Sequence, residues 1–342
     1  MEEMLQQPAA LVTLHNLYKT STAIPRKRLR ELVSTWPPTV VFTGMASSLF
    51  AAYPAQVFLS SLGIRALVWE TADLLHYHLK FLGKDTLLVI VSQSGESVEI
   101  KKLVDAVPKH VGMVAVVNAE DSFLAKTVKF TLPMKAGTQT SVSTKTYNSS
   151  VALLMYLAFA IAEELLEPLN RAVCRAAQIQ SRLIEQREAF LPQMLGLFDR
   201  PGAIMVLSRG PDLSTVYEGA LYFKEVARLP AEPMSAGQFR HGPLETIDPG
   251  RVFIVIARRG KTAKLLLKLA DFISSNRGKV LLLSDIPLHS NSICNVKVGS
   301  VALGLGTLVD SLYLQFLTHE LALRAGLDSG HFWIHSSVVR VE

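Results

Sequence analysis

Residues 87–97 read LLVIVSQSGES, an apolar β-branched run that passes directly into hydroxyl, amide and glycine residues. The apolar run predicts a buried strand of a parallel sheet, because strands covered on both faces read as nearly continuous hydrophobic segments. In a doubly wound sheet, ligands bind beyond the carboxyl ends of the strands. The small hydroxyl side chains, the glycine and the free amides of a following helix therefore favour a phosphate monoester as the ligand of this turn.

Apolar β-branched runs alternate with helix-length amphipathic stretches along the whole chain, a pattern that predicts an α/β fold. In the first half we expect strands at residues 39–43, 64–69, 86–92, 113–117 and 128–132, and a long helix from about residue 144. In the second half we expect strands at 203–207, near 232, at 252–257, 279–283 and 295–298, and a helix from about residue 307.

The two halves repeat one plan. Ser92 corresponds to Ala257 and Asn148 to Tyr313, and all the matching positions are separated by 166 residues to within a few. This constancy predicts a duplicated domain, although two unrelated α/β domains of similar size could give the same strand spacing. The expected divisions are an N-terminal helical segment at 1–34, a first domain at 35–168, a second at 169–327 and a C-terminal tail at 328–342.

Composition excludes several classes of protein. Of the 342 residues 49% are hydrophobic and 19% are charged, which excludes disorder over most of the chain. The net charge is +6, but basic residues cluster only at 26–30, which we interpret as a solvated helix face and not as a nucleic-acid interface. Residues 151–162 are too few for the about 20 that a membrane helix needs, so we expect a buried helix and no membrane partner.

The first residues of the chain and the spacing of its two cysteines predict its cellular location. The acidic start of the chain lacks an uninterrupted apolar core, so we expect no signal peptide. Cys174 and Cys294 lie 120 positions apart without metal-ligand spacing, which favours neither a disulfide nor a zinc site. We therefore expect a cytoplasmic protein with two buried, reduced thiols.

Two further helix starts of the first half are rich in hydroxyl residues. Ser47 and Ser48 follow the first predicted strand, and Ser143 and Thr144 precede the long helix. Each pair alone is typical of an ordinary N-cap. Three such starts in one half favour a ligand site, and the matching residues of the second half, Ala-Arg-Arg-Gly-Lys-Thr at 257–262, lack the serines.

The second half supplies carboxylates. Glu218, Tyr222 and Glu225 are spaced by four and by seven residues and share one face of a predicted apolar helix. Desolvation at such a boundary raises a carboxyl pKa and suits the group to general-base catalysis near neutral pH. The alternative is a solvated Glu225 that pairs with a neighbouring lysine or arginine.

One histidine lies in a turn bounded by glycines. His241 follows Arg240 in this turn, where its ordinary pKa near 6.5 suits a proton shuttle. The alternative is a loop histidine bonded to the backbone. His76 and His78 lack a third ligand and predict no metal site, and His331 and His335 are weaker candidates in the tail.

The succession of residues 92–97, 143–145, 218–225 and 240–244 resembles the tandem sugar isomerase (SIS) domains of phosphosugar enzymes. It is similar in particular to the isomerase half of glutamine:fructose-6-phosphate amidotransferase, over residues 35–342. The resemblance implies two tandem SIS domains, each a doubly wound parallel sheet with helices on both faces. It implies no metal and no other cofactor.

The resemblance also implies roles for individual residues. The sugar phosphate would be held by the hydroxyl and amide side chains of Ser48, Ser92, Gln93, Ser94 and Ser97. The carboxylate at position 225 would move a proton between C1 and C2 of the open-chain sugar. The imidazole at position 241 would open the sugar ring and would come from the neighbouring subunit of a homodimer.

Differences from the residues of the amidotransferase reduce the number of reactions that we expect of this chain. No lysine follows Lys297, so the imine that the amidotransferase forms through a lysine of its tail is not expected at residues 334–340. Tyr222 replaces a lysine of the amidotransferase, and Ala46 stands where related phosphate loops often have glycine. No glutaminase domain is present in the 342 residues, so we do not expect glutamine to be the chain's own ammonia source.

These features favour a deaminase or isomerase that converts an amino-hexose 6-phosphate, such as glucosamine 6-phosphate, to a ketose 6-phosphate. One alternative is aldose–ketose isomerisation of a phosphosugar. Another is a surviving aminotransferase served by a separate glutaminase chain. A sensor that binds phosphosugars without catalysis is the alternative from another class, and the presence of both Glu225 and His241 counts against it.

Overall fold

The computed structural model describes the chain except residues 200, 289, 331, 333, 335–337 and 339–342. The chain divides into two compact units. The N-terminal unit comprises residues 6–177 and the tail residues described after 331. The C-terminal unit comprises residues 1–5 and, as far as they are described, 178–331.

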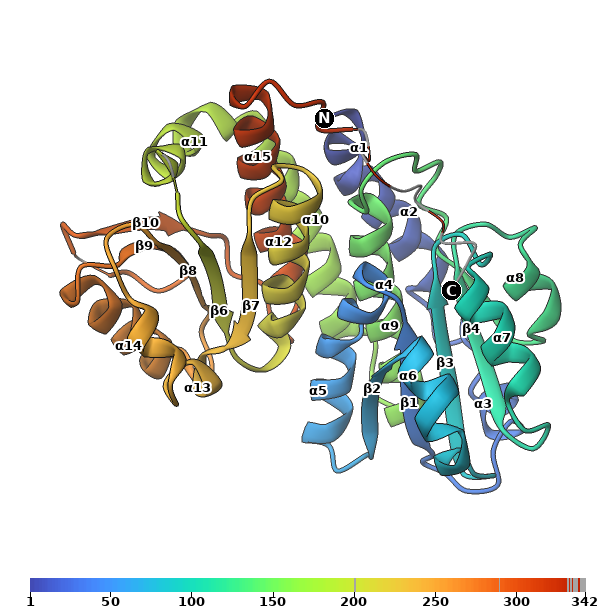
Figure 1. Ribbon diagram of the computed structural model, residues 1–342. Coiled ribbons are helices and arrows are strands. Elements are labelled where there is room, and N and C mark those ends of the chain that lie inside the picture. Colours follow the sequence, from blue (N-terminus) through green and yellow to red (C-terminus); the bar gives the residue numbers. More distant parts are fainter. Residues whose placement is uncertain (200, 289, 331, 333, 335–337, 339–342) are drawn as a thin grey trace. The chain divides into compact units, whose positions relative to one another are not determined.

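The N-terminal unit is built on a five-stranded parallel sheet of order β2-β1-β3-β4-β5 (Figure 1). In register, Val89 of the central strand lies between Phe42 and Val114 of its neighbours. Both faces of the central strands are buried, as their unbroken apolar sequences predict. The strands are β1 (Thr39–Gly44), β2 (Ala66–Glu70), β3 (Thr86–Ser92), β4 (Gly112–Val117) and β5 (Thr131–Pro133).

Helices cover both faces of this sheet. Alternate residues of the strands pack against α7 and α8 on one face, and α9 packs with α2 and α5. Every residue of α9 except the last is buried, so the buried helix expected at 151–162 is confirmed. The elements are α2 (Gln7–Tyr18), α3 (Arg26–Arg30), α4 (Ser47–Phe50), α5 (Tyr53–Ser61), α6 (Thr71–Asp73), η1 (Leu74–His78), η2 (Leu79–Phe81), α7 (Val98–Ala106), α8 (Phe123–Thr127) and α9 (Lys145–Ala162).

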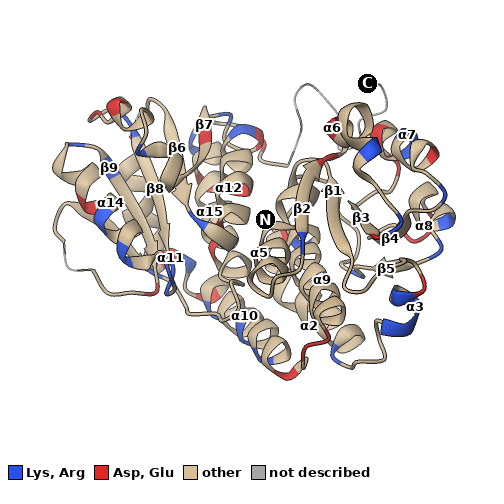
Figure 2. Cartoon of the chain, turned by 90° about the horizontal axis from the view of Figure 1, so that it is seen from below, with Lys and Arg blue, Asp and Glu red and all other residues tan. Residues whose placement is uncertain are grey.

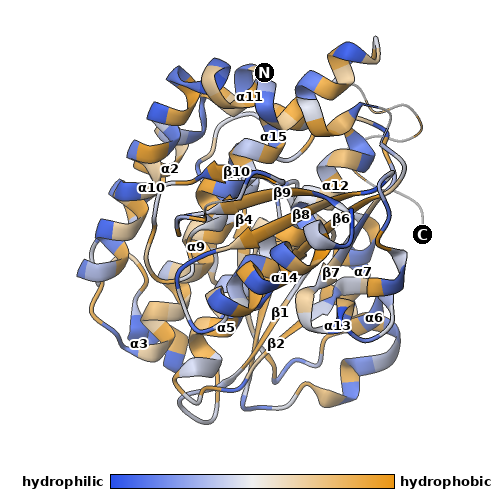
Figure 3. Cartoon of the chain, turned by 90° about the vertical axis from the view of Figure 1, so that its left-hand side faces the viewer, coloured by the Kyte–Doolittle hydropathy of each residue, from blue (hydrophilic) through white to orange (hydrophobic). Residues whose placement is uncertain are grey.

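The C-terminal unit repeats the topology. Its parallel sheet has the order β10-β9-β8-β6-β7, which is the order of the first sheet when each strand is matched to its counterpart five places later. Ile254 lies in register between Val206 and Leu281, and the strands are largely hydrophobic in Figure 3. The strands are β6 (Ile204–Ser208), β7 (Ala231–Ser235), β8 (Val252–Ala257), β9 (Lys279–Ser284) and β10 (Ile293–Lys297).

The helices of the second sheet follow the same plan. α14 packs on β8 and β9, and α12 packs on β6, β7 and α15. Helix α15, like α9, is the long buried helix that closes its half. Besides α10 (Glu167–Glu185), which spans the division between the units, the elements are α1 (Glu2–Leu5), α11 (Arg187–Leu195), η3 (Gly196–Phe198), η4 (Gly210–Asp212), α12 (Leu213–Glu225), α13 (Ala236–Phe239), η5 (Pro243–Thr246), α14 (Ala263–Ser275) and α15 (Thr307–Arg324).

The α/β fold with two doubly wound parallel sheets is therefore confirmed. The largest strand error concerns residues 128–132, because Val128 is the C-cap residue of α8 and the strand begins only at Thr131. The basic residues at 26–30 lie in α3, which is largely blue in Figure 2. Most of their side chains are exposed, as expected of a solvated helix face. Cys174 and Cys294 are free thiols but are half-buried, so the expectation of buried thiols was wrong. Among the described residues, no helix is both long and apolar enough to cross a bilayer.

Candidate functional site

The turn after β3 has a fixed shape. Gly95 adopts a positive φ of 65°, and its amide donates to the Ser92 hydroxyl at 3.0 Å. A side chain at Gly95 would place a Cβ 2.7 Å from the Cβ of Ser122, so only glycine fits against the start of α8. The Leu124 amide donates to the Gly95 carbonyl at 3.2 Å and holds the turn from the same side.

Asn118 ties this turn to the segment before α9. The amides of Asn118 and Ala119 donate to the Gln93 carbonyl at 3.2 and 3.1 Å. The Asn118 side chain donates to the Gly137 carbonyl at 2.8 Å and accepts from the Ala136 amide at 3.0 Å. Sequence reasoning missed this residue, although its polar side chain at the end of β4 was a signal.

The turn after β1 brings a second pair of hydroxyl residues to the same edge. A Cβ on Gly44 would lie 2.9 Å from the Val91 carbonyl oxygen and 3.0 Å from the Cβ of Ser48. Glycine therefore lets the first turn of α4 approach the end of β3. This approach places Ser47 and Ser48 beside the turn that begins at Ser92.

Ala46, the residue before α4, carries backbone strain. Its φ is 46° and its ψ is −124°, a combination that favours glycine. Such strain costs on the order of 1–3 kcal/mol and is commonly found at functional sites. The departure noted in the sequence, alanine in place of the glycine of related loops, thus falls on a strained position.

The third hydroxyl segment is organised by Gln139. Its side-chain amide donates to the Thr144 hydroxyl at 3.1 Å, and its carbonyl oxygen accepts from the Thr146 amide at 3.1 Å. The Ser143 hydroxyl lies 3.0 Å from the Thr146 hydroxyl. Gln139 thus caps the start of α9, a role that the sequence did not reveal because the glutamine precedes the helix by six residues.

Four side chains of the predicted set remain available to a ligand. Those of Ser47, Ser48, Gln93 and Ser97 are partly exposed and make no hydrogen bond within the described part of the chain. Ser97 is the N-cap residue of α7, yet its hydroxyl makes no capping bond. The amides of the first turn of α7 are therefore free of a side-chain cap, as an anion-binding helix start requires. Ser94 differs, since its hydroxyl accepts from the Glu96 amide at 3.3 Å.

Charged groups border this edge. Glu96 pairs with Lys101 at 2.7 Å, and hydrogen bonds from Lys101 and from the Phe123 amide lower the pKa of its carboxyl. Lys145 in the first turn of α9 is 4% exposed and donates to the Gln6 side-chain carbonyl at 2.6 Å. This buried ammonium adds positive charge to the end of the sheet where the hydroxyls gather.

The described part of the tail reaches the same helix start. Val338 lines a cavity of about 480 Å³, open to solvent, with Glu96, Val98 and Lys101. His331 and His335 lie outside the described residues, as does Arg340.

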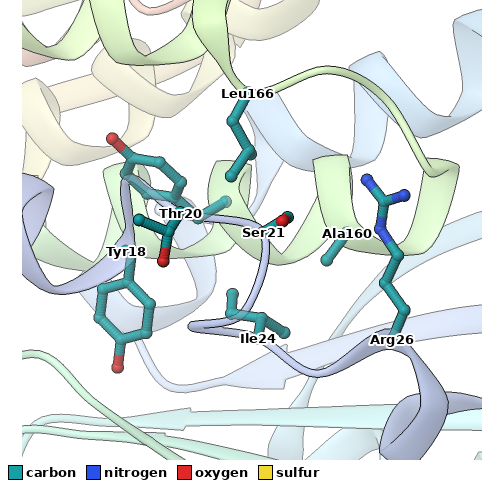
Figure 4. Close-up of a pocket in the computed structure, with 8 residues that line it drawn as sticks. Tyr18, Thr20, Ser21, Ile24, Arg26, Ala160 and Leu166 are labelled. Atoms are coloured by element: carbon teal, nitrogen blue, oxygen red, sulfur yellow. The ribbon is translucent and has the colours of Figure 1, made fainter.

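A separate pocket of the N-terminal unit lies beside the C-terminal half of α9 (Figure 4). Its interior has room for only about one water molecule, which excludes a sugar phosphate. Tyr18 and Tyr156 on its walls are engaged in hydrogen bonds to Pro133 and Asn170. The lining residues are Tyr18, Thr20, Ser21, Ile24, Arg26, Tyr156, Ala160 and Leu166.

The predicted carboxylates lie on α12 of the C-terminal unit. Glu218 is completely buried, whereas Glu225, the last residue of the helix, is partly exposed. The Tyr222 hydroxyl is buried and accepts from the Gln315 side chain of α15 at 2.8 Å. A Cβ on Gly219 would overlap Leu314, so glycine permits the close packing of α12 on α15. Of the two carboxylates, the one at position 225 is therefore the one that solvent reaches.

His241 is exposed in the turn after α13. Its amide donates to the Gln238 carbonyl at 2.9 Å, and Gly242 follows with a φ of 117°. The imidazole makes no hydrogen bond to any described residue, so the alternative of a ring bonded to the backbone is not observed. The Arg209 guanidinium lies beneath this segment, 3.4 Å from the position of a Cβ on Gly237.

The remaining histidine candidates do not form a metal site. His78 stacks on the Trp69 ring with 4.6 Å between centroids, and His76 lies against Tyr77. Within the described residues, no group of three histidine, cysteine, aspartate or glutamate side chains is arranged to hold a metal ion.

Comparisons with known proteins agree with the fold of two similar units. The SIS domain model matches residues 36–162 and again 197–322. Over 333 residues, 95% of this chain, it is 26% identical to a glutamine–fructose-6-phosphate aminotransferase (isomerizing) of Pyrococcus horikoshii and covers 55% of that protein. The chain thus spans about half the length of the curated relatives it matches.

Solved structures share the fold. The tagatose-6-phosphate ketose/aldose isomerase of Escherichia coli matches with a TM-score of 0.81 and 18% identity, over 98% of this chain and 96% of that one. The glucosamine-6-phosphate deaminase of Thermotoga maritima matches with a TM-score of 0.73 and 19% identity, over 99% of this chain and all of the other.

Proposed function

Because the chain belongs to the SIS domain family, we propose that it is a phosphosugar enzyme that converts an amino-hexose 6-phosphate, such as glucosamine 6-phosphate, to a ketose 6-phosphate and ammonia. The observation that carries the proposal is the set of available polar groups at one sheet edge. Ser47, Ser48, Gln93 and Ser97 point to no described partner of their own and adjoin an uncapped helix start. A phosphate dianion accepts hydrogen bonds from such groups.

The chemistry requires one acid–base group at the sugar carbons. After ring opening, which we assign to His241, the carboxylate of Glu225 removes the proton from C2 and returns it at C1. The electrons of the C2–H bond form the C1–C2 double bond of an enolamine as O1 takes up a proton. Protonation at C1 and loss of a proton from the nitrogen give the ketimine, which adds water and releases ammonia and the ketose phosphate. The aldehyde carbon is reduced and the amine-bearing carbon is oxidised, so no external redox partner is consumed.

The remaining features of the assembly belong to the same proposal. We propose a cytoplasmic homodimer in which His241 acts in the site of the partner subunit. The exposure of this imidazole and its freedom from hydrogen bonds to described residues support a role outside its own turn. Ser92, Ser94 and Thr144 accept hydrogen bonds within their turns, which orients their hydroxyls and leaves each O–H able to donate to the phosphate. The Ser143 hydroxyl is shared with that of Thr146, and we assign it to the shape of the site.

The experiment measures release of ammonia and fructose 6-phosphate from glucosamine 6-phosphate by the purified protein, without glutamine. We expect Glu225→Gln to lower kcat by about 10²–10⁴-fold, the usual contribution of a general base, with little change in substrate affinity. Glu232→Gln is the matched control, because Glu232 is an exposed glutamate of the same unit.

Other outcomes select the alternatives. Interconversion of hexose phosphates without ammonia release would replace the deaminase proposal with an aldose–ketose isomerase that uses the same residues. Binding of a sugar phosphate without turnover would point to the sensor. Full activity of Glu225→Gln would contradict the assignment of the proton shuttle.

A further inference from the structure

The turn after β8 is the counterpart of the turn after β3. Gly260 stands at the position of Gly95, and both adopt a positive φ, of 150° and 65°. Thr262 stands at the position of Ser97, and each is the N-cap residue of the next helix without a side-chain capping bond. The second sheet has therefore kept the glycine and the hydroxyl N-cap of the turn that we propose for phosphate binding.

A buried ion pair fills the end of the second sheet. Arg258, the counterpart of Gln93, is 8% exposed and donates through Nε to Asp310 at 2.8 Å. A second nitrogen, Nη2, pairs with the other Asp310 oxygen and also donates to the Gly306 carbonyl at 3.3 Å. Nη1 donates to the Gly299 carbonyl at 2.6 Å. Asp310 is fully buried in the first turn of α15, so its carboxylate is held by a bidentate guanidinium next to a helix start.

A second carboxylate takes the backbone donor of the turn. The Arg259 amide donates to Asp285 Oδ1 at 2.8 Å. The amide of its counterpart Ser94 makes no hydrogen bond among the described residues. At the second sheet, the Arg259 amide and the Arg258 guanidinium therefore donate to aspartates, whereas the corresponding groups of the first sheet make no such bonds.

Asp212 adds a third acidic group to this edge. It is almost completely buried, and burial, followed by the nearby charge of Asp310, raises the pKa of its carboxyl to about 8. Asp212, Asp285 and Asp310 thus all lie near the Arg258 guanidinium. With its raised pKa Asp212 is mostly protonated near neutral pH, so the negative charge that opposes the entry of a phosphate dianion comes from the carboxylate that pairs with Arg258.

We propose that the C-terminal unit retains an oxyanion site at this edge and that the Asp310 carboxylate occupies it permanently, in the place of a ligand phosphate. The comparison of the two turns rests on the proposed function of the first, but the occupied site is defined by its own contacts. Each chain then offers one open phosphate site, at the first sheet.

The occupied site has a structural consequence for α12. Thr307 of α15 accepts from the Thr215 hydroxyl at 2.7 Å, and Gln315 of α15 donates to Tyr222. The carboxylate that anchors the first turn of α15 therefore also fixes the helix that ends at Glu225. An internal anion gives this helix a position that does not depend on any bound ligand.

The test removes the internal carboxylate and offers an external one. In Asp310→Ala, made in an Asp212→Asn background so that Asp212 cannot take over the pairing, Arg258 lacks its anion. We expect inorganic phosphate to raise the thermal unfolding temperature of this variant by about 3 °C or more beyond its effect on the Asp212→Asn parent, with chloride at equal ionic strength as the reference. Removal of both charges in Arg258→Met/Asp310→Leu, on the same background, should abolish this extra effect.

Two further measurements keep the outcome decisive. Asp310→Asn keeps the size of the side chain and serves if the alanine variant does not fold. Ser97→Ala in every variant weakens the proposed site of the first sheet, so that the remaining phosphate effect comes from the second. Equal stabilisation by phosphate of parent, single and paired variants would overturn the proposal. Because unfolding is measured and not turnover, failure of the proposed enzymatic function would leave this result unaffected.

Discussion

The carboxyl ends of the two sheets have the same topology and opposite chemistry. At the first sheet, the side chains of Gln93 and Ser97 make no hydrogen bond to described residues. At the second, Arg258 is enclosed by the Asp310 carboxylate and two backbone carbonyls. The same order of strands thus supports a site open to a ligand and a site satisfied from within. The difference between the two edges lies in a few residues after the strands and not in the sheet itself, and it is on those residues that the proposed function rests.

The largest expected effect comes from substitutions at Arg258 and at its counterpart Gln93, the residues at which the two sheet edges differ most. Arg258→Ala leaves Asp310 as a buried carboxylate without its guanidinium, so we expect a loss of about 3–5 kcal/mol in the free energy of unfolding, measured by urea denaturation. Gln93→Ala, the change at the counterpart position, should alter that free energy by less than about 0.5 kcal/mol and lower sugar-phosphate affinity instead. Similar destabilisation by both variants would mean that the two turns do not differ in the way described.

A smaller effect on ligand affinity is expected at the N-cap residues of α7 and α14, Ser97 and Thr262. Ser97→Ala removes a hydroxyl expected to donate to the ligand phosphate, and a hydrogen bond to a charged group contributes about 1.5–3 kcal/mol. We therefore expect affinity for glucosamine 6-phosphate, measured by titration calorimetry, to fall by roughly 10- to 100-fold. Thr262→Ala is the matched control, because it removes a hydroxyl from the same position of the other turn. A comparable loss of affinity in the control would place a ligand at the second sheet as well.

Sequence patterns were sufficient for the sheets because those patterns are local. The bounds of β3 and β8 agree with the prediction at both ends, since each strand is an unbroken apolar run that ends where polar residues begin. The three hydroxyl-rich segments were placed at one edge because successive parallel strands present their carboxyl ends together. What the hydroxyls do was less predictable, since Ser94 and Thr144 are engaged within their turns and Ser97 is not.

Long-range polar pairing was not predictable from one sequence. Arg258 and Asp310 are separated by 52 residues, and neither has a local spacing that suggests a partner. Helical periodicity placed Glu218 and Glu225 on one face, but only the packing of α12 against α15 shows that the first is completely buried. In each case the missing information was the position of a neighbouring element, which the local pattern does not contain.

The smallest expected effect concerns the turn after the first strand of each sheet. Each turn has one residue with positive φ: Ala46 at 46° in the N-terminal unit and Gly210 at 63° in the C-terminal unit. No atom lies within 4 Å of a Cβ built on Gly210, so Gly210→Ala should report backbone strain alone and destabilise the protein by about 1 kcal/mol.

Ala46→Gly tests the opposite change. Glycine relieves the backbone strain, but its greater chain entropy in the unfolded state offsets part of this gain. We expect a net increase of up to about 1 kcal/mol in the free energy of unfolding. If the strained alanine holds the first turn of α4 in place, the same variant should bind glucosamine 6-phosphate several-fold more weakly, because Ser47 and Ser48 follow it directly. A gain in stability with unchanged affinity would show that the strain does not serve the site. A loss of stability would show that packing around Ala46 outweighs its backbone conformation.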